Sequence, residues 1–260
     1  MARPSTTFAL LLAKSRYAVL AVTPLGFMLS AYLTIRLFPN AQGSGIPQAI
    51  AARHLTDQGA RESLVSIRIA VGKVILTLFG LLCGASVGRE GPTVQVGASI
   101  MFALGRVSPR RQPGLILAGA AAGVAAAFNT PLAGIVFGIE EMSRAFETRT
   151  SSLIIAAVIA AGLTSLALAG NYAYFGSSAT SLARGADWLA VPLCGAAGGL
   201  AGGLFSRIVI AMARGFNNPL GRAIKGHPLW FAFACGLAVA ICGLVSPLHQ
   251  ERGCPGQARA

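Results

Sequence analysis

The sequence predicts an all-α, polytopic membrane protein built from tilted and broken helices. Apolar residues make up 54% of the 260 residues and charged residues only 11%, against roughly 25% charged in an ordinary soluble domain. Several apolar stretches reach the length of about 20 residues that crosses a bilayer. A single soluble core could not hide this much apolar surface, and a disordered chain would be far less hydrophobic. Soluble enzymes and disordered proteins are therefore excluded.

Apolar segments follow one another along the chain, and each predicts a helix. They cover residues 17–38, 64–87, 93–105, 114–139, 152–176, 188–213 and 229–248. The segment 93–105 is too short to cross a bilayer alone. The segment 114–139 carries Asn129-Thr130-Pro131, and a proline inside a helix removes a hydrogen bond and clashes with the preceding turn. We therefore expect two part-length helices there, as in many ion pathways.

The chain is expected to form a single partial membrane transport domain over residues 1–260. It comprises an N-terminal cytoplasmic segment (1–16), membrane helices (17–248) and an atypical polar tail (249–260). The first apolar run is too long for the core of a signal peptide, so it predicts a first spanning helix.

The net charge of +13 comes from basic residues that lie mostly between apolar segments. No basic run is interleaved with aromatic residues, so nucleic acid is not an expected partner. These charges suit loops that face anionic lipid head groups, and the same field would attract a permeating anion. The sequence holds no C-x-x-C pair and no H-E-x-x-H motif, so neither a metal site nor a cofactor is expected.

A first candidate anion site is Gly43-Ser44-Gly45-Ile46-Pro47, which follows the first span. Proline suits the first turn of a helix, and the flanking glycines leave backbone N–H groups open at the helix start. Such an end carries partial positive charge and suits an anion. The alternative is a simple turn between two helices.

A second candidate with the same design is Gly88-Arg89-Glu90-Gly91-Pro92. Here a carboxylate stands at the open N–H groups, so it can occupy the anion site and vacate it when protonated or displaced. The alternative is an ion pair between Arg89 and Glu90 in a loop.

Three of the eight acids, Glu90, Glu140 and Glu141, lie in or against apolar segments. An acid inside a bilayer is costly, so such residues are candidates for proton transfer. The alternative for Glu140 and Glu141 is that they mark a helix end near the head groups. Two cations, Lys73 and Arg68, also fall in an apolar segment, where we expect them to reach the interface or to line an aqueous vestibule.

Three stretches in order resemble the CLC family of voltage-gated chloride channels and chloride/proton antiporters. They are Gly43 to Pro47, Gly88 to Gln95, and Ala127 to Gly134 continuing to Glu140-Glu141. The resemblance implies two inverted halves of tilted helices, a homodimer with one pore per subunit, and chloride and protons as substrates. It implies that Ser44 lines a central chloride site, that Glu90 is the gating glutamate, and that Glu141, with Glu140 beside it, transfers protons internally.

The resemblance also implies a membrane location, in a bacterial-type inner membrane. The family's second-half motifs, a G-x-F-x-P helix start and a pore tyrosine, do not occur here, so we expect a chain truncated in the second inverted repeat. Chloride transport, by antiport or through a channel, is the expected function; the alternative is a truncated, transport-inactive member. A membrane enzyme using the same carboxylates is not expected, because no nucleophile–base pairing supports one.

Overall fold

The described part of the chain consists of helices. The computed structural model describes residues 18–143, 148–170, 188–214 and 226–245, and no strand lies among them, which confirms the all-α fold class. The helices are α2 (Val19–Leu37), α3 (Ile46–His54), α4 (Gln58–Leu64), α5 (Ile67–Leu82), α6 (Glu90–Leu104), α7 (Gln112–Phe128), α8 (Pro131–Phe137), α9 (Thr148–Ala169), α10 (Ala190–Arg214) and α12 (Pro228–Val245). Two 3-10 turns, η1 (Gly105–Val107) and η2 (Pro109–Arg111), join α6 to α7, and a π-helical turn, η3 (Gly138–Ser143), follows α8.

The helices fall into two compact units. The first contains α2 to α9, the second contains α10, and α12 begins in the second and ends in the first. All the candidate site residues belong to the first unit. The predicted N-terminal segment and polar tail lie outside the described residues, and the single domain over residues 1–260 stays a prediction.

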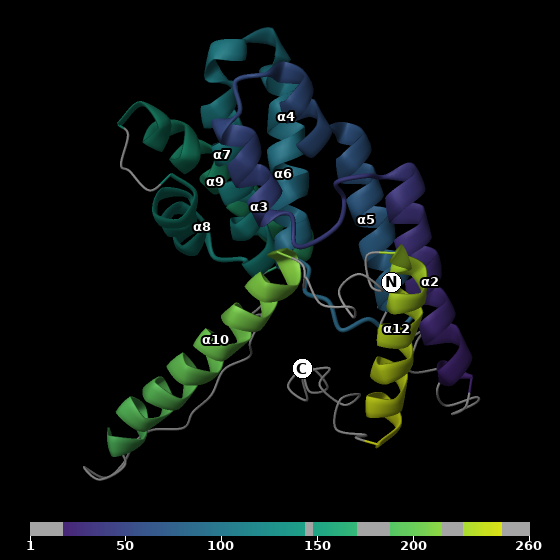
Figure 1. The fold of residues 1–260 in the computed structure, drawn as a ribbon. Helices are drawn as coiled ribbons and strands as arrows, with labels where there is room; N and C mark the ends of the chain where they lie inside the picture. Colours follow the sequence, from purple (N-terminus) through teal and green to yellow (C-terminus); the bar gives the residue numbers. More distant parts are fainter. Residues whose placement is uncertain (1–17, 144–147, 171–187, 215–225, 246–260) are drawn as a thin grey trace. The chain divides into compact units, whose positions relative to one another are not determined.

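Helix α7 forms the centre of the first unit. It packs against α3, α6, α8 and α9, which surround it in Figure 1. Eleven of its 17 residues are buried, and most of these are small. The small residues let α6 and α7 approach closely: a Cβ built on Gly119 of α7 would lie 2.7 Å from Cγ of Met101 on α6. This close pair gives the first turn of α6 a fixed position.

The predicted break in the segment 114–139 is confirmed. Helix α7 ends at Phe128, and Asn129 adopts the left-handed conformation with φ of 56°. Asparagine tolerates this conformation better than most residues and often ends helices in this way. Pro131 then opens α8, where its missing N–H leaves no helix hydrogen bond unmade.

Side-chain caps define the starts of α4 and α5. The Asp57 carboxylate accepts a hydrogen bond of 2.7 Å from the Ala60 N–H at the start of α4. The Ser66 hydroxyl accepts one of 3.4 Å from the Ile69 N–H at the start of α5. Both residues are preferred N-caps because their oxygens satisfy N–H groups that have no partner within the helix.

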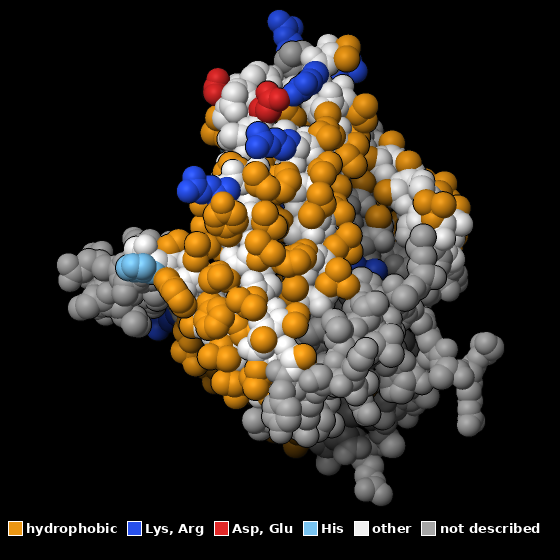
Figure 2. Space-filling view, turned by 90° about the vertical axis from the view of Figure 1, so that its right-hand side faces the viewer, with side chains coloured by type: hydrophobic (Ala, Val, Ile, Leu, Met, Phe, Trp, Pro, Cys, Tyr) orange, Lys and Arg blue, Asp and Glu red, His pale blue; other side chains and the backbone are white. Residues whose placement is uncertain are grey.

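The outer surface of the first unit is strongly apolar. Helices α2 and α5 expose large apolar side chains, including Leu25, Leu29, Val74 and Ile75. Figure 2 shows a broad apolar surface, with basic and acidic side chains gathered beyond one end of it. Within the described part of the chain, three stretches are long and apolar enough to cross a membrane: Val19–Leu37, Gln58–Leu82 and Ala190–Ala211. The prediction of a polytopic membrane protein is therefore confirmed.

Candidate functional site

The Ser44 loop (residues 41–45) turns the chain from α2 into α3. Gly43 and Gly45 have φ of 72° and 100°, in the left-handed region that a side chain disfavours. Pro47 lies in the first turn of α3, as its position in the sequence predicts. The Ala49 N–H donates to the Gly45 carbonyl over 3.1 Å and closes the first helical turn.

The Ser44 hydroxyl lies at the N-terminus of α3. Its oxygen accepts a hydrogen bond of 3.4 Å from the Ile46 N–H, and the side chain is exposed. Because this oxygen acts as an acceptor, the hydroxyl proton can be donated to a ligand. The helix end adds partial positive charge, so an anion is the ligand best suited to this position.

The Ser44 loop packs directly against the first turn of α6. A Cβ built on Gly45 would lie 2.7 Å from Cβ of Gln95 and 3.0 Å from the carbonyl oxygen of Gly91. A Cβ built on Gly91 would in turn lie 3.0 Å from Cβ of Ser44. Both glycines are buried. The fold thus brings the first two sequence motifs into contact through their glycines.

Glu90 is the first residue of α6 and is half-buried. Its side chain folds back over Gly88, so that a Cβ on Gly88 would lie 3.1 Å from the carboxyl carbon. The Thr93 hydroxyl donates to the Glu90 backbone carbonyl over 2.7 Å and fixes this turn. A carboxylate at a helix start is favoured by the helix dipole. Glu90 also precedes Gly91, which touches the Ser44 loop.

Arg89 connects the second motif to the third. Its guanidinium donates a hydrogen bond of 3.3 Å to the backbone carbonyl of Ala127, in the last turn of α7. The last carbonyls of a helix have no partner within the helix, so a cation there is favourable. This contact holds the start of α6 beside the break between α7 and α8.

Lys73 of α5 is a functional candidate whose partners could not be read from the sequence. Its ammonium group donates to the carbonyl oxygens of Ala41 and Gly43, over 2.8 Å and 2.7 Å. The residue is 3% exposed, so it neither reaches the interface nor lines a vestibule, and that expectation was wrong. Arg68, by contrast, is exposed and donates to the carbonyl of Leu37 over 3.0 Å. Lys73 therefore places a buried positive charge directly behind the Ser44 loop.

Gln95 holds the other side of the same loop region. This fully buried side chain donates from Nε2 to the carbonyls of Asn40 and Leu64, over 3.2 Å and 3.0 Å. A buried polar group is costly without hydrogen bonds, so Gln95 and Lys73 strongly favour this one path of the chain. The sequence signal for both was a lone polar residue within an apolar helix, which gives no hint of its partners.

The acids of the third motif lie in the π-helical turn η3. Glu140 is exposed, and the side chain of Glu141 lies outside the described part. Two contacts described above join the three motifs: Gly45 packs against Gly91, and Arg89 donates a hydrogen bond to the Ala127 carbonyl. The roles of Glu140 and Glu141 in proton transfer stay predictions.

Comparison with known proteins identifies the family. The family model described as voltage gated chloride channel matches residues 26–254. The H⁺/Cl⁻ exchange transporter ClcA of Yersinia pseudotuberculosis is 34% identical over 92% of this chain and 51% of its own length. The chloride channel protein CLC-d of Arabidopsis thaliana is 28% identical over 86% of this chain and 32% of its own length.

A solved structure, the X-ray crystal structure of a slow cyanobacterial Cl⁻/H⁺ antiporter, has a similar fold. It matches with a TM-score of 0.72 and 26% identity over 92% of this chain and 56% of its own chain. The chain spans about half the length of the bacterial relatives it matches. The family match and the identity to the exchangers agree with the three motifs that the fold connects, and the chain belongs to the voltage gated chloride channel (CLC) family.

Proposed function

We propose that this chain binds chloride and moves it across a membrane in exchange for protons. The observation that carries the proposal is the contact between the Ser44 loop and the first turn of α6. Two helix starts and the Ser44 hydroxyl thereby lie together, and the residue next to Gly91 carries the Glu90 carboxylate, which is the chemistry that a regulated anion site needs. The names of the exchange transporters that the chain resembles support the same activity.

In the proposed mechanism, chloride binds between the Ser44 hydroxyl and the backbone N–H groups at the starts of α3 and α6. The Glu90 carboxylate competes with chloride for the start of α6. When Glu90 takes up a proton or is displaced, the site becomes free for the anion. Chloride occupancy and protonation are coupled in this way. Weak dipole contacts, rather than a full counter-charge at the ion, permit release.

Lys73 contributes a fixed positive charge behind the loop. Because its ammonium group holds the carbonyls of Ala41 and Gly43, it turns their negative ends away from the anion and toward itself. We expect this charge to raise the local chloride concentration without contacting the ion.

Several finer properties belong to the same proposal. Glu141, with Glu140 beside it, would pass protons to the inner solution. The protein would act as a homodimer in a bacterial-type inner membrane, and it would be a transporter rather than an enzyme. The exchange transporters of Yersinia and of Citrobacter koseri, which are 34% and 35% identical to this chain, support the antiporter over the passive channel.

Flux from liposomes tests the proposal. The purified 260-residue chain should release chloride and drive opposing proton movement, and Glu90→Gln should abolish proton movement while some chloride flux remains. Asp187→Asn, which removes an acid from a polar connection, is the matched control and should leave both fluxes unchanged. Proton movement that survives Glu90→Gln would contradict the mechanism.

A transport-inactive protein is distinguished by a binding measurement. If liposomes with this chain release no more chloride than empty ones, calorimetric titration with chloride tests whether the chain still binds the anion. Binding that weakens in Ser44→Ala would support the anion site and reject transport by this chain alone. Absence of chloride binding would reject the site as well.

A further inference from the structure

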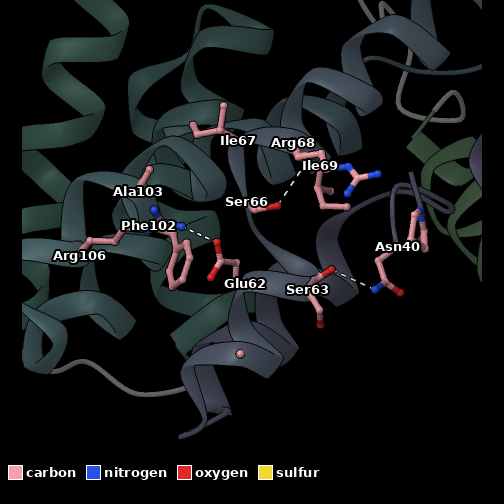
Figure 3. A pocket seen from close by; sticks show the side chains of 12 residues that line it. Asn40, Glu62, Ser63, Ser66, Ile67, Arg68, Ile69, Phe102, Ala103 and Arg106 are labelled. Carbon is pink, nitrogen blue, oxygen red and sulfur yellow. Dashed lines mark hydrogen bonds and ion pairs between the residues drawn. The ribbon is translucent and has the colours of Figure 1, made fainter. Parts of the chain in front are cut away.

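A pocket separate from the Ser44 loop opens where α4, α5 and α6 meet. It has a volume of about 480 Å³ and is lined by both polar and apolar side chains, within the range of roughly 300–1,000 Å³ typical of small-molecule sites. Figure 3 shows Glu62 and Arg106 directed toward each other on one side of the pocket, and Asn40 and Arg68 on the other. Phe102 and Ile67 supply apolar surface.

The pocket lies at the border between polar and apolar surfaces. It includes residues from the start of α5, inside the candidate span Gln58–Leu82. Ile67 in its wall is 48% exposed. The Glu62–Arg106 ion pair has side chains that are 54% and 60% exposed. This combination matches the depth at which a lipid head group meets its acyl chains.

The charges that line the pocket are not balanced. Glu62, Arg68 and Arg106 are its ionised residues, and two cations with one anion leave a net charge of +1. The ion pair of Glu62 with Arg106 neutralises one of the cations. The remaining charge belongs to Arg68, which the described contacts tie to the Leu37 carbonyl by a single hydrogen bond. A guanidinium has five N–H donors, so several are left for a ligand.

We propose that this pocket binds the phosphate of an anionic phospholipid, with Arg68 as the main phosphate ligand and the acyl chains lying over Ile67 and the exposed face of α5. A phosphodiester carries one negative charge, which would neutralise the pocket. Guanidinium groups bind phosphate oxygens in a planar, two-pronged geometry. Basic pockets between membrane helices bind anionic head groups in the same way.

The bound lipid would also affect the Ser44 loop. Asn40 lines the pocket, and its side chain donates to the Ser63 carbonyl over 2.9 Å. The backbone carbonyl of Asn40 accepts from Gln95, which packs against Gly45. A lipid that orders the pocket would therefore stabilise the path of the loop. This step makes the pocket a regulatory site beyond the proposed transport function.

Native mass spectrometry of the detergent-purified 260-residue chain tests the proposal. The chain is titrated with phosphatidylglycerol, phosphatidylcholine or inorganic phosphate. We expect one phosphatidylglycerol to bind about tenfold more tightly than phosphatidylcholine. The first lipid carries one net negative charge and the second carries none, whereas the pocket carries one net positive charge near the membrane surface. Equal binding of the two lipids would overturn the proposal, and so would displacement of phosphatidylglycerol by millimolar inorganic phosphate, which would assign the site to a free anion.

Matched variants separate this pocket from a diffuse basic surface. Arg68→Gln should remove the preference for phosphatidylglycerol, whereas Arg110→Gln, an exposed cation outside the pocket, should keep it. Equal loss in the two variants would overturn the proposal. Glu62→Gln frees Arg106 and raises the pocket charge, so it should strengthen phosphatidylglycerol binding several-fold. Misfolding cannot explain such a gain in binding, so the gain would be specific evidence for the pocket. Unchanged or weaker binding of phosphatidylglycerol in Glu62→Gln would contradict the proposal.

Discussion

Two polar interruptions of the apolar sequence are fixed by different means. The first, the Ser44 loop with the first turn of α6, is built from segments that lie far apart in the chain. It depends on buried glycines, on Lys73 from α5 and on Gln95 from α6. The second, from Asn129 to the turn η3, is defined by neighbouring residues: a left-handed asparagine and then a proline. Tertiary contacts specify the first, whereas local backbone preferences specify the second.

This difference bears on function. A loop held by a buried cation, a buried amide and backbone contact keeps its N–H groups at fixed positions, as an anion site requires. The second interruption ends in η3, where Glu140 is exposed to its surroundings. An acid that exchanges protons with solvent needs such access. The two regions thus suit the two ions of the proposed exchange.

The largest expected effect is the cost of a side chain at Gly45. Gly45→Ala would force a Cβ into a left-handed residue and against Gln95, so the free energy of unfolding should fall by about 2–4 kcal/mol. Gly170→Ala is the matched control, because Gly170 has φ of 77° but nothing within 4 Å of its Cβ position. Thermal unfolding in detergent compares them. Equal losses would show that backbone strain, and not contact with α6, makes Gly45 necessary.

The next effect concerns the buried cation. Lys73→Met leaves the Ala41 and Gly43 carbonyls without their donor, which costs about 1–3 kcal/mol, partly offset because a buried charge is removed. We expect net destabilisation of about 1–2 kcal/mol together with weaker chloride binding. Arg36→Met, at an exposed cation in the last turn of α2, should change neither property. Chloride binding that is unaffected by Lys73→Met would show that Lys73 does not contribute to the anion site.

A smaller effect tests the local character of the second interruption. Asn129→Ala should lower the free energy of unfolding by about 1 kcal/mol, because alanine disfavours the left-handed conformation. Asn129→Gly should leave it nearly unchanged or raise it slightly, since glycine adopts this conformation readily. The midpoint of chemical unfolding measures both. A large loss with glycine would mean that the asparagine side chain makes a necessary contact, and the break would then not be local.

The sequence predicted what local preference determines. Each apolar segment that falls in the described part contains a helix, and Asn129 and Pro131 correctly predicted the division of α7 from α8. The apolar segment 93–105 begins three residues after the start of α6, because Glu90 and Gly91 look like part of a polar turn, whereas the second candidate motif correctly predicted a helix start with Pro92. Proline at position 92 lies in the first turn, where it removes no hydrogen bond.

The contacts that shape the site could not be predicted from local pattern. The meeting of Gly45 with Gly91 joins residues far apart in sequence, and the resemblance to a known family implied roles for Ser44 and Glu90 but not this contact. Lys73 lies 32 and 30 positions along the chain from its carbonyl partners, Ala41 and Gly43. A lone lysine in an apolar helix predicts that some partner exists, but hydrophobic periodicity carries no information about which loop supplies it.

In the proposed mechanism, Ser44 and Glu90 belong to one chloride site. A double-mutant cycle tests it most directly, with chloride dissociation constants measured calorimetrically for the original chain, Ser44→Ala, Glu90→Gln and the double variant. The account predicts that the two changes are coupled by at least about 0.5–1 kcal/mol, as expected for groups that share a ligand. Changes in binding free energy that simply add would show that the two residues act at separate places, and would contradict the site described here.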